Sequence, residues 1–260
     1  MVLADKTDIG FLAHVDAGKT SLIESLMYVS GMRRTFGRVD HRDSFLDTER
    51  LERERGITIW AKLAELSYSG RNYTLIDTPG HVDFALEAER SLSLLDYAVL
   101  VVAEGKIPGH TRHLYRMLKK HRIPVLIFIN KMDMADARRE TSFAAVKESL
   151  ADDAVDFTSL DDSVYEEIAE KREDLIEKFL SGESITTENI RSLWKDCLIT
   201  PVLFGSALKN EGITELLEFL NTYTERKEYP EEFGLEAAKL LYEKGNLLTL
   251  AKVTGGSSSP

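Results

Sequence analysis

The sequence predicts an α/β fold: a mostly parallel six-stranded sheet with helices on both faces and one antiparallel strand. Apolar runs bounded by turn residues alternate with amphipathic stretches from Asp8 to about Arg226, which is typical of a sheet whose parallel strands are joined by helices. A Gly-Lys turn directly follows the first apolar run. Two further runs are joined by the polar segment 69–72, which favours a hairpin and therefore one antiparallel strand.

Each predicted element takes its limits from local signals. The six predicted strands are apolar runs that end at turn residues: Ile9–Ala13, Ile59–Tyr68, Tyr73–Asp77, Tyr97–Val102, Val125–Asn130 and Val202–Phe204. The predicted helices begin at the turn after Ala13, after Gly80, after Gly109, near Arg139, after Ser163, after Thr187 and after Gly212. Gly182 is the expected end of the helix that begins after Ser163.

Composition excludes several classes of protein. The 260 residues hold 33 Lys and Arg against 44 Asp and Glu, a net charge of −11, which argues against broad, non-specific coating of nucleic acid. The single cysteine, Cys197, can form neither an internal disulfide nor a zinc cage. No run of eighteen apolar residues and no basic N-terminal leader occurs, so we expect a cytoplasmic protein without membrane contact. We also expect a monomer.

The first chemical signal is Ala13–Thr20 (AHVDAGKT), which follows the first predicted strand and opens the first helix. Backbone N–H groups of such a turn point at phosphate oxygens, Lys19 adds a positive charge, and the Thr20 hydroxyl can bind Mg²⁺. Ala13 stands where the common pattern has its first glycine. Taken alone, the segment is therefore also compatible with a surface lysine in an ordinary strand-to-helix turn.

The second signal is Asp77–His81 (DTPGH), at the end of the apolar strand Tyr73–Asp77. An aspartate at this position can hold magnesium through water, and Gly80 lets a backbone N–H approach the terminal phosphate. His81 follows this glycine directly, which favours a catalytic role over that of a solvated loop histidine.

The third signal is Asn130–Asp133 (NKMD), at the end of the strand Val125–Asn130. The Asp133 carboxylate can accept hydrogen bonds from N1–H and the exocyclic amine of guanine, whereas it would face acceptors on adenine. We expect Asn130 to tie this loop to the segment Ala13–Thr20, the phosphate loop, and the stem of Lys131 to lie over the base. All three signals occur in order at the carboxyl ends of predicted strands, where open α/β sheets bind ligands.

With these motifs in view, residues 7–226 resemble the G domain of translational GTPases, a P-loop NTPase fold. The resemblance is to the elongation factor G branch and its relatives, the tetracycline-resistance ribosomal protection proteins. Residues 107–112 and 160–200 look nearer to the protection proteins. The segments that carry the resemblance are Ala13–Thr20, Glu54–Ile59, Asp77–Phe84, Asn130–Asp133, Leu175–Gly182 and Gly205–Ala207.

The resemblance implies a role for each matched residue. His81 is the expected catalytic residue, which orients the attacking water. Thr20, Thr58 and Asp77 are the expected magnesium site, with Thr58 binding the metal only when the γ-phosphate is present. The implied nucleotide-binding residues are Asp16, Ala17, Gly18, Lys19, Thr20, Ser21, Gly80, Asn130, Lys131, Asp133, Ser206, Ala207 and Leu208.

The chain differs from these families in where its sequence ends. Residues 1–228 are the expected G domain, with an insertion at about 150–198. Residues 229–260 resemble the truncated start of a second domain followed by a flexible tail. We expect an isolated G domain, so activities that need further domains are in doubt for this polypeptide.

Three functions are compatible with the motifs. The first is a Mg²⁺-dependent hydrolase that converts GTP to GDP and phosphate, slowly in isolation and faster with the ribosome, whose RNA is the implied partner. The second is a nucleotide-dependent switch with negligible turnover, and elongation factor G proper is a variant of the first. The third, an acidic interaction module with a decayed pocket, fits least because Lys19, Asp77 and Asp133 are intact.

Overall fold

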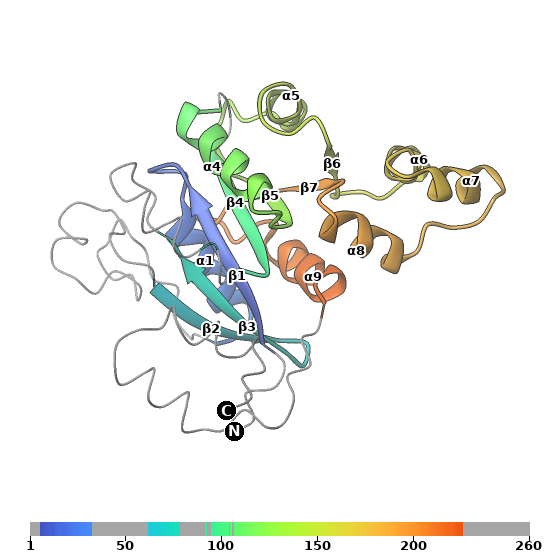
Figure 1. Ribbon diagram of the computed structural model, residues 1–260. Coiled ribbons are helices and arrows are strands. Elements are labelled where there is room, and N and C mark those ends of the chain that lie inside the picture. The colour runs from blue at the N-terminus through green and yellow to red at the C-terminus, as the bar shows by residue number, and fades with distance from the viewer. Residues whose placement is uncertain are drawn as a thin grey trace, which may run out of the picture.

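The computed structural model describes residues 6–32, 62–78, 92, 95–103, 105 and 107–225. Its core is one seven-stranded sheet with helices on both faces (Figure 1). The strands are β1 (Lys6–Ala13), β2 (Lys62–Tyr68), β3 (Arg71–Asp77), β4 (Tyr97–Ala103), β5 (Val125–Asn130), β6 (Ala154–Asp156) and β7 (Thr200–Phe204). The predicted helix after Gly80, the start of the second predicted strand and the tail 229–260 lie outside the described residues.

The strand order is β2-β3-β1-β4-β5-β7-β6, and only β2 runs antiparallel to its neighbour. Strands β2 and β3 form the predicted hairpin, closed by a two-residue turn at Ser69 and Gly70 with Tyr68 opposite Arg71. Both turn residues have positive φ, 48° and 76°, as a tight hairpin that follows the twist of its strands requires. The predicted fold class is therefore confirmed.

The predicted number of strands, six, is one too low, because the described residues form a seven-stranded sheet. The additional strand, β6, has only three residues and pairs in parallel with β7 at the sheet edge. Its two apolar residues, Ala154 and Val155, lie between Asp153 and Asp156 and show no apolar run. The strand forms because β7 offers it a partner rather than because of its own pattern.

Helices bury the two faces of the sheet separately. The described helices are α1 (Lys19–Val29), α4 (Gly109–Lys120), α5 (Arg139–Ser149), α6 (Asp162–Ala169), α7 (Glu173–Leu180), α8 (Thr187–Lys195) and α9 (Ile213–Tyr223). Residues of α1, α6, α7, α8 and α9 belong to one core cluster, and residues of α4 and α5 to the other. Among the described residues, no helix has the length and apolar character needed to cross a membrane.

The central strands show why the sheet is covered on both sides. Every residue of β5 is buried, with Leu126 and Phe128 in one core cluster and Ile127 and Ile129 in the other. Successive side chains of a strand point to opposite faces, so a continuous apolar run is the sequence of a strand buried on both faces.

The single helix predicted to end at Gly182 is two helices, α6 and α7. Arg172 lies between them in an extended conformation, with φ −152° and ψ 131°. Its guanidinium donates to the carboxylate of Asp174 in the first turn of α7, and acidic residues favour a helix N-terminus at this point. Both helices lie beyond the β6 edge of the sheet (Figure 1).

The amino ends of the strands hold the segment that follows α9. Arg71, 6% exposed, donates to the backbone carbonyls of Asn221, Thr224 and Glu225 at 2.7, 2.9 and 2.9 Å. The Thr7 hydroxyl also donates to the Glu225 carbonyl. These carbonyls lie at the end of a helix, where no intrahelical donor reaches them, so Arg71 anchors the point at which the chain leaves the sheet.

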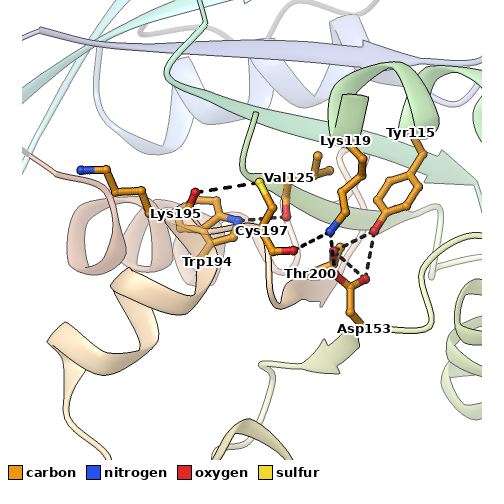
Figure 2. Close-up of polar contacts among 8 residues, drawn as sticks. All are labelled: Tyr115, Lys119, Val125, Asp153, Trp194, Lys195, Cys197 and Thr200. Atoms are coloured by element: carbon orange, nitrogen blue, oxygen red, sulfur yellow. Dashed lines mark hydrogen bonds and ion pairs between the residues drawn. The ribbon is translucent and has the colours of Figure 1, made fainter. Parts of the chain in front are cut away.

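A polar network joins α4 to the β6 and β7 edge (Figure 2). Asp153 accepts hydrogen bonds from Tyr115 at 3.0 Å, from Thr200 at 3.0 Å and from Lys119 at 2.7 Å. Lys119 also donates to the Cys197 carbonyl. Burial is the main reason why the pKa of Tyr115 is raised, and the nearby Asp153 carboxylate raises it further.

This pKa shift predicts a loss of stability in alkaline solution. Because folding raises the pKa of Tyr115, the contribution of its protonated hydroxyl to the free energy of unfolding is complete below the unfolded pKa near 10. As the pH rises further, this contribution falls by up to about 1.4 kcal/mol per pH unit. Urea unfolding at pH 8 to 11 should show a shallower decline for Tyr115→Phe than for the unmodified chain. Identical slopes would contradict the assignment.

Candidate functional site

The predicted motifs meet at one edge of the sheet. Strands β1, β3, β5 and β7 run parallel to one another, so the segments that follow Ala13, Asp77, Asn130 and Phe204 emerge on the same side. This is the edge at which open α/β sheets bind ligands.

The phosphate loop turns tightly between β1 and α1. The Ala17 N–H donates to the His14 carbonyl at 3.2 Å, and Asp16 and Gly18 both have positive φ, 63° and 89°. Gly18 is the N-cap of α1, and no side chain caps this end of the helix. The first N–H groups of α1 are therefore oriented as a helix presents them to an anion.

Lys19 joins this loop to the end of β3. Its ammonium lies 2.5 Å from Asp77 Oδ1 and donates to the Thr78 carbonyl, while the Thr20 hydroxyl lies 3.4 Å from Asp77 Oδ2. Lys19 is 7% exposed and Asp77 1%. Charges so deeply buried are stable only when they are paired, so the two motifs form one electrostatic unit.

Asn130 connects the remaining loops. Its Nδ2 donates to the Ala17 carbonyl at 2.9 Å, and its Oδ1 accepts from the Ala207 N–H at 2.9 Å. The predicted tie between Asn130 and the phosphate loop is thus confirmed. The side chain is 2% exposed, and it binds two loops with one amide.

The loop after β7 is closed on itself. The backbones of Ser206 and Glu211 exchange two hydrogen bonds, 2.9 and 3.0 Å. Ser206 and Ala207 are buried, whereas Leu208 is 46% exposed. A Cβ at Gly205 would lie 2.2 Å from the Glu211 carbonyl oxygen, so only glycine fits there. Sequence reasoning did not single out this requirement, although Gly205 directly precedes the Ser-Ala pair.

Lys131 and Asp133 lie beside this loop. Lys131 has φ +66° and redirects the chain after Asn130, and the next residue, Met132, donates its N–H to the Gly205 carbonyl at 3.0 Å. Lys131 is half-buried and Asp133 is exposed, so the Asp133 carboxylate is accessible to a ligand. Ser21 lies half-buried in the first turn of α1.

Sequence reasoning assigned no role to Thr78, although it lies within the second motif. Its carbonyl accepts from Lys19 and its hydroxyl donates to the Phe11 carbonyl at 2.7 Å, which holds the end of β3 against β1. Gly80, His81 and Thr58 lie outside the described residues.

The donor set near Asp77 fits magnesium. The Thr20 hydroxyl and the Asp77 carboxylate are hard oxygen donors on adjacent segments, and Mg²⁺ commonly takes only one or two protein oxygens together with substrate phosphates. The described residues contain no group of three or more His, Cys, Asp or Glu side chains that could hold a metal by themselves. A site of this kind would rely on phosphate oxygens for its other ligands.

Comparison with known families decides the assignment. The family described as "Elongation factor Tu GTP binding domain" matches residues 5–226. The chain belongs to this family. It is therefore a G domain of the translational GTPase class, whose members hydrolyse GTP.

Curated relatives of the domain are tetracycline resistance proteins. TetM of Ureaplasma urealyticum is 36% identical over an alignment of 260 residues that covers 91% of this chain and 40% of the relative. TetW of Butyrivibrio fibrisolvens is 37% identical over 228 residues, covering 81% and 36%. The chain thus spans about 40% of the length of the relatives it matches.

A solved structure from Thermus thermophilus has the same fold as this G domain. It aligns with a TM-score of 0.77 and 20% identity, over 85% of this chain and 40% of the other. At this identity the likeness concerns the fold alone.

The contact between Gly18 and Asn130 predicts the effect of a single methyl group. A Cβ at Gly18 would lie 2.3 Å from Asn130 Nδ2, and φ is +89°. Gly18→Ala should therefore displace the Asn130 amide, lower the free energy of unfolding by about 1–3 kcal/mol, and weaken GDP binding more than tenfold by calorimetry.

Gly31→Ala is the matched control. Its φ is +79°, but an added Cβ would meet nothing within 4 Å, so the backbone strain is similar without the collision. This variant should lose some stability and keep its GDP affinity. Equal affinities for the two variants would show that the Asn130 contact is unimportant for the nucleotide.

Proposed function

We propose that this G domain binds GTP with Mg²⁺ and hydrolyses it to GDP and phosphate, slowly alone and faster on the ribosome, as part of a ribosomal protection-type protein. The observation that carries the proposal is the convergence of the loops after β1, β3, β5 and β7, with Asn130 joining the phosphate loop to the Ser206 loop. The sequence motifs on these loops are those of a guanine nucleotide site.

In this proposal the phosphate groups bind at the start of α1. The backbone N–H groups of residues 16–21 would donate to phosphate oxygens, and Lys19 would neutralise charge on the β- and γ-phosphates. The contacts of the Lys19 ammonium with Asp77 and Thr78, which join the phosphate loop to the end of β3, support this role. Gly80 would bring a backbone N–H to the terminal phosphate.

The base would bind between the loops after β5 and β7. Asp133 would accept from the guanine N1–H and exocyclic amine, the stem of Lys131 would cover one face of the base, and the backbone of residues 206–208 would contact its edge. The exposure of Asp133 and the hydrogen bond between Met132 and Gly205, which places the two loops side by side, support this arrangement.

Thr20 and Asp77, with Thr58 from the segment 33–61, would hold the magnesium ion. When bound, the ion neutralises charge that develops on the phosphate oxygens. His81 would orient the attacking water, and the ribosome would set its position, so we expect slow turnover in isolation. The hydroxyl and carboxylate donors beside Lys19 support the metal assignment.

We also propose how the chain divides. Residues 1–228 would form the G domain, with the insertion at about 150–198, and residues 229–260 would begin a second domain. The match over residues 5–226 and the names of the tetracycline-resistance relatives support this division and the protection-type role. The same domain in elongation factor G proper, or as a switch with negligible turnover, is the alternative.

Phosphate release from GTP, measured with and without added ribosomes, tests the proposal. We expect a low basal rate, stimulation by ribosomes, and dependence on Mg²⁺. His81→Ala should retain GDP affinity and lose the stimulation by about 10²–10⁴-fold. Binding of GTP without release under any condition would favour the switch, and absence of binding would exclude the nucleotide site.

Guanine selection has its own test. Asp133→Asn replaces one acceptor oxygen by a donor, so the variant should lose affinity for GDP by at least tenfold and gain relative affinity for xanthosine diphosphate, whose position 2 carries an acceptor. Competition against a fluorescent GDP analogue measures both constants. An unchanged order of preference would exclude Asp133 from base recognition.

A further inference from the structure

A second connection between the phosphate and base sides of the site lies outside the sequence motifs. Ser25, in the middle of α1, is completely buried, and its hydroxyl donates to Asn210 Oδ1 at 2.6 Å. The two residues are 185 positions apart in the sequence. Ser25 therefore links the helix that begins at Lys19 to the loop after β7.

Asn210 belongs to the same closed loop as the proposed guanine contacts. It has φ +57°, a left-handed conformation that asparagine tolerates better than most residues. It precedes Glu211, whose backbone exchanges two hydrogen bonds with Ser206. The Lys209 N–H also donates to the carbonyl and hydroxyl of Ser206. A side chain that fixes Asn210 therefore also fixes the backbone of Ser206 and Ala207.

The loop is thus held at both ends. Near its start, the Ala207 N–H is bound by Asn130, which also holds the phosphate loop at Ala17. Near its end, Asn210 is bound by Ser25, about 9 Å along α1 from Lys19 at 1.5 Å per residue. Both tethers end on the phosphate loop or on the helix that it opens, so they set the separation between the phosphate-binding N–H groups and the guanine-binding backbone.

We propose that Ser25 and Asn210 are positioning residues for guanine recognition. Their hydrogen bond fixes where residues 206–208 lie relative to the phosphate loop. This inference rests on the proposed function, because it assigns the base to that loop. The two side chains contact each other and are not among the proposed nucleotide contacts, so removing either one acts through the backbone of the loop.

Base binding and phosphate binding should respond differently to the loss of the hydrogen bond between Ser25 and Asn210. If the hydrogen bond positions residues 205–211, the base-recognition loop, its loss lowers the affinity for ligands that use guanine contacts. It leaves the affinity for ADP unchanged, because ADP has the same ribose and diphosphate but lacks the guanine edge. A merely structural role would lower the melting temperature without changing the selectivity between bases. The ratio of GDP to ADP affinity is therefore the informative quantity.

The experiment measures both affinities by competition against a fluorescent GDP analogue. Ser25→Ala should bind GDP about tenfold more weakly, which corresponds to about 1.4 kcal/mol, with ADP affinity unchanged. Asn210→Gly removes the same hydrogen bond and suits the positive φ. If circular dichroism shows that Ser25→Ala does not fold, Asn210→Gly provides the test. Asn210→Asp keeps an acceptor oxygen for the Ser25 hydroxyl and should have the same GDP:ADP affinity ratio as the unmodified chain.

Ser30→Ala is the matched control on the same helix. The Ser30 hydroxyl donates to the Met27 carbonyl at 3.2 Å, and its backbone N–H caps the helix end, so the variant loses one hydrogen bond that lies within the end of α1. It should keep the GDP:ADP ratio. The double variant of Ser25 and Asn210 should match the single variants, because one interaction cannot be removed twice.

Two kinds of failure are distinguishable. If the unmodified chain does not bind GDP, the proposed function is wrong. If the unmodified chain binds GDP but Ser25→Ala and Asn210→Gly keep its GDP:ADP ratio, or their effects add in the double variant, the positioning role is overturned while the proposed function stands.

Discussion

The site depends on one buried amide. Asn130 ends β5, is almost fully buried, and uses its oxygen and its nitrogen on two different loops. An asparagine amide can satisfy a donor and an acceptor at once, whereas an aspartate or a leucine of similar size can satisfy at most one of these partners. The phosphate loop and the Ser206 loop are therefore not placed independently, because both are referred to the carboxyl end of the same strand.

Burial makes these connections effective. Lys19 and Asp77 lie in an interior where an unpaired charge is costly. At Gly18 and Gly205 the packing is so close that an added Cβ would collide with its neighbours. Short contacts of this kind reduce the number of conformations that the loops can adopt without a ligand. A binding surface arranged in advance loses less entropy when a ligand arrives.

The sequence predicted the fold and the motif positions well where signals were local. Apolar runs that end at turn residues located β1, β3, β4, β5 and β7, and motif spacing placed the tie made by Asn130. The strand β6 escaped prediction because its two apolar residues, Ala154 and Val155, lie between Asp153 and Asp156. The break at Arg172, where the backbone is extended, interrupts a stretch whose polar and apolar residues otherwise suit one helix. The bond between Ser25 and Asn210 was unpredictable because only the packed fold brings those two side chains together.

The carboxyl and amino ends of the strands hold different parts of the molecule. The carboxyl ends carry the loops of the candidate site, whereas the amino ends carry Arg71 and its three carbonyl partners. Strand β3 contributes to both, since it begins at Arg71 and ends at Asp77. The anchor of the segment after α9 and the partner of Lys19 are thus connected by a single strand of seven residues.

The position of β6 at the sheet edge has a consequence for divergence among relatives. Helices α6 and α7 lie beyond that last strand (Figure 1), so residues can be gained or lost there without altering the pairing of any interior strand. The exposed faces of α6 and α7 can therefore change in charge while the carboxyl ends of the interior strands keep their geometry, whereas Ile168, Ala169 and Leu175 are held by the core.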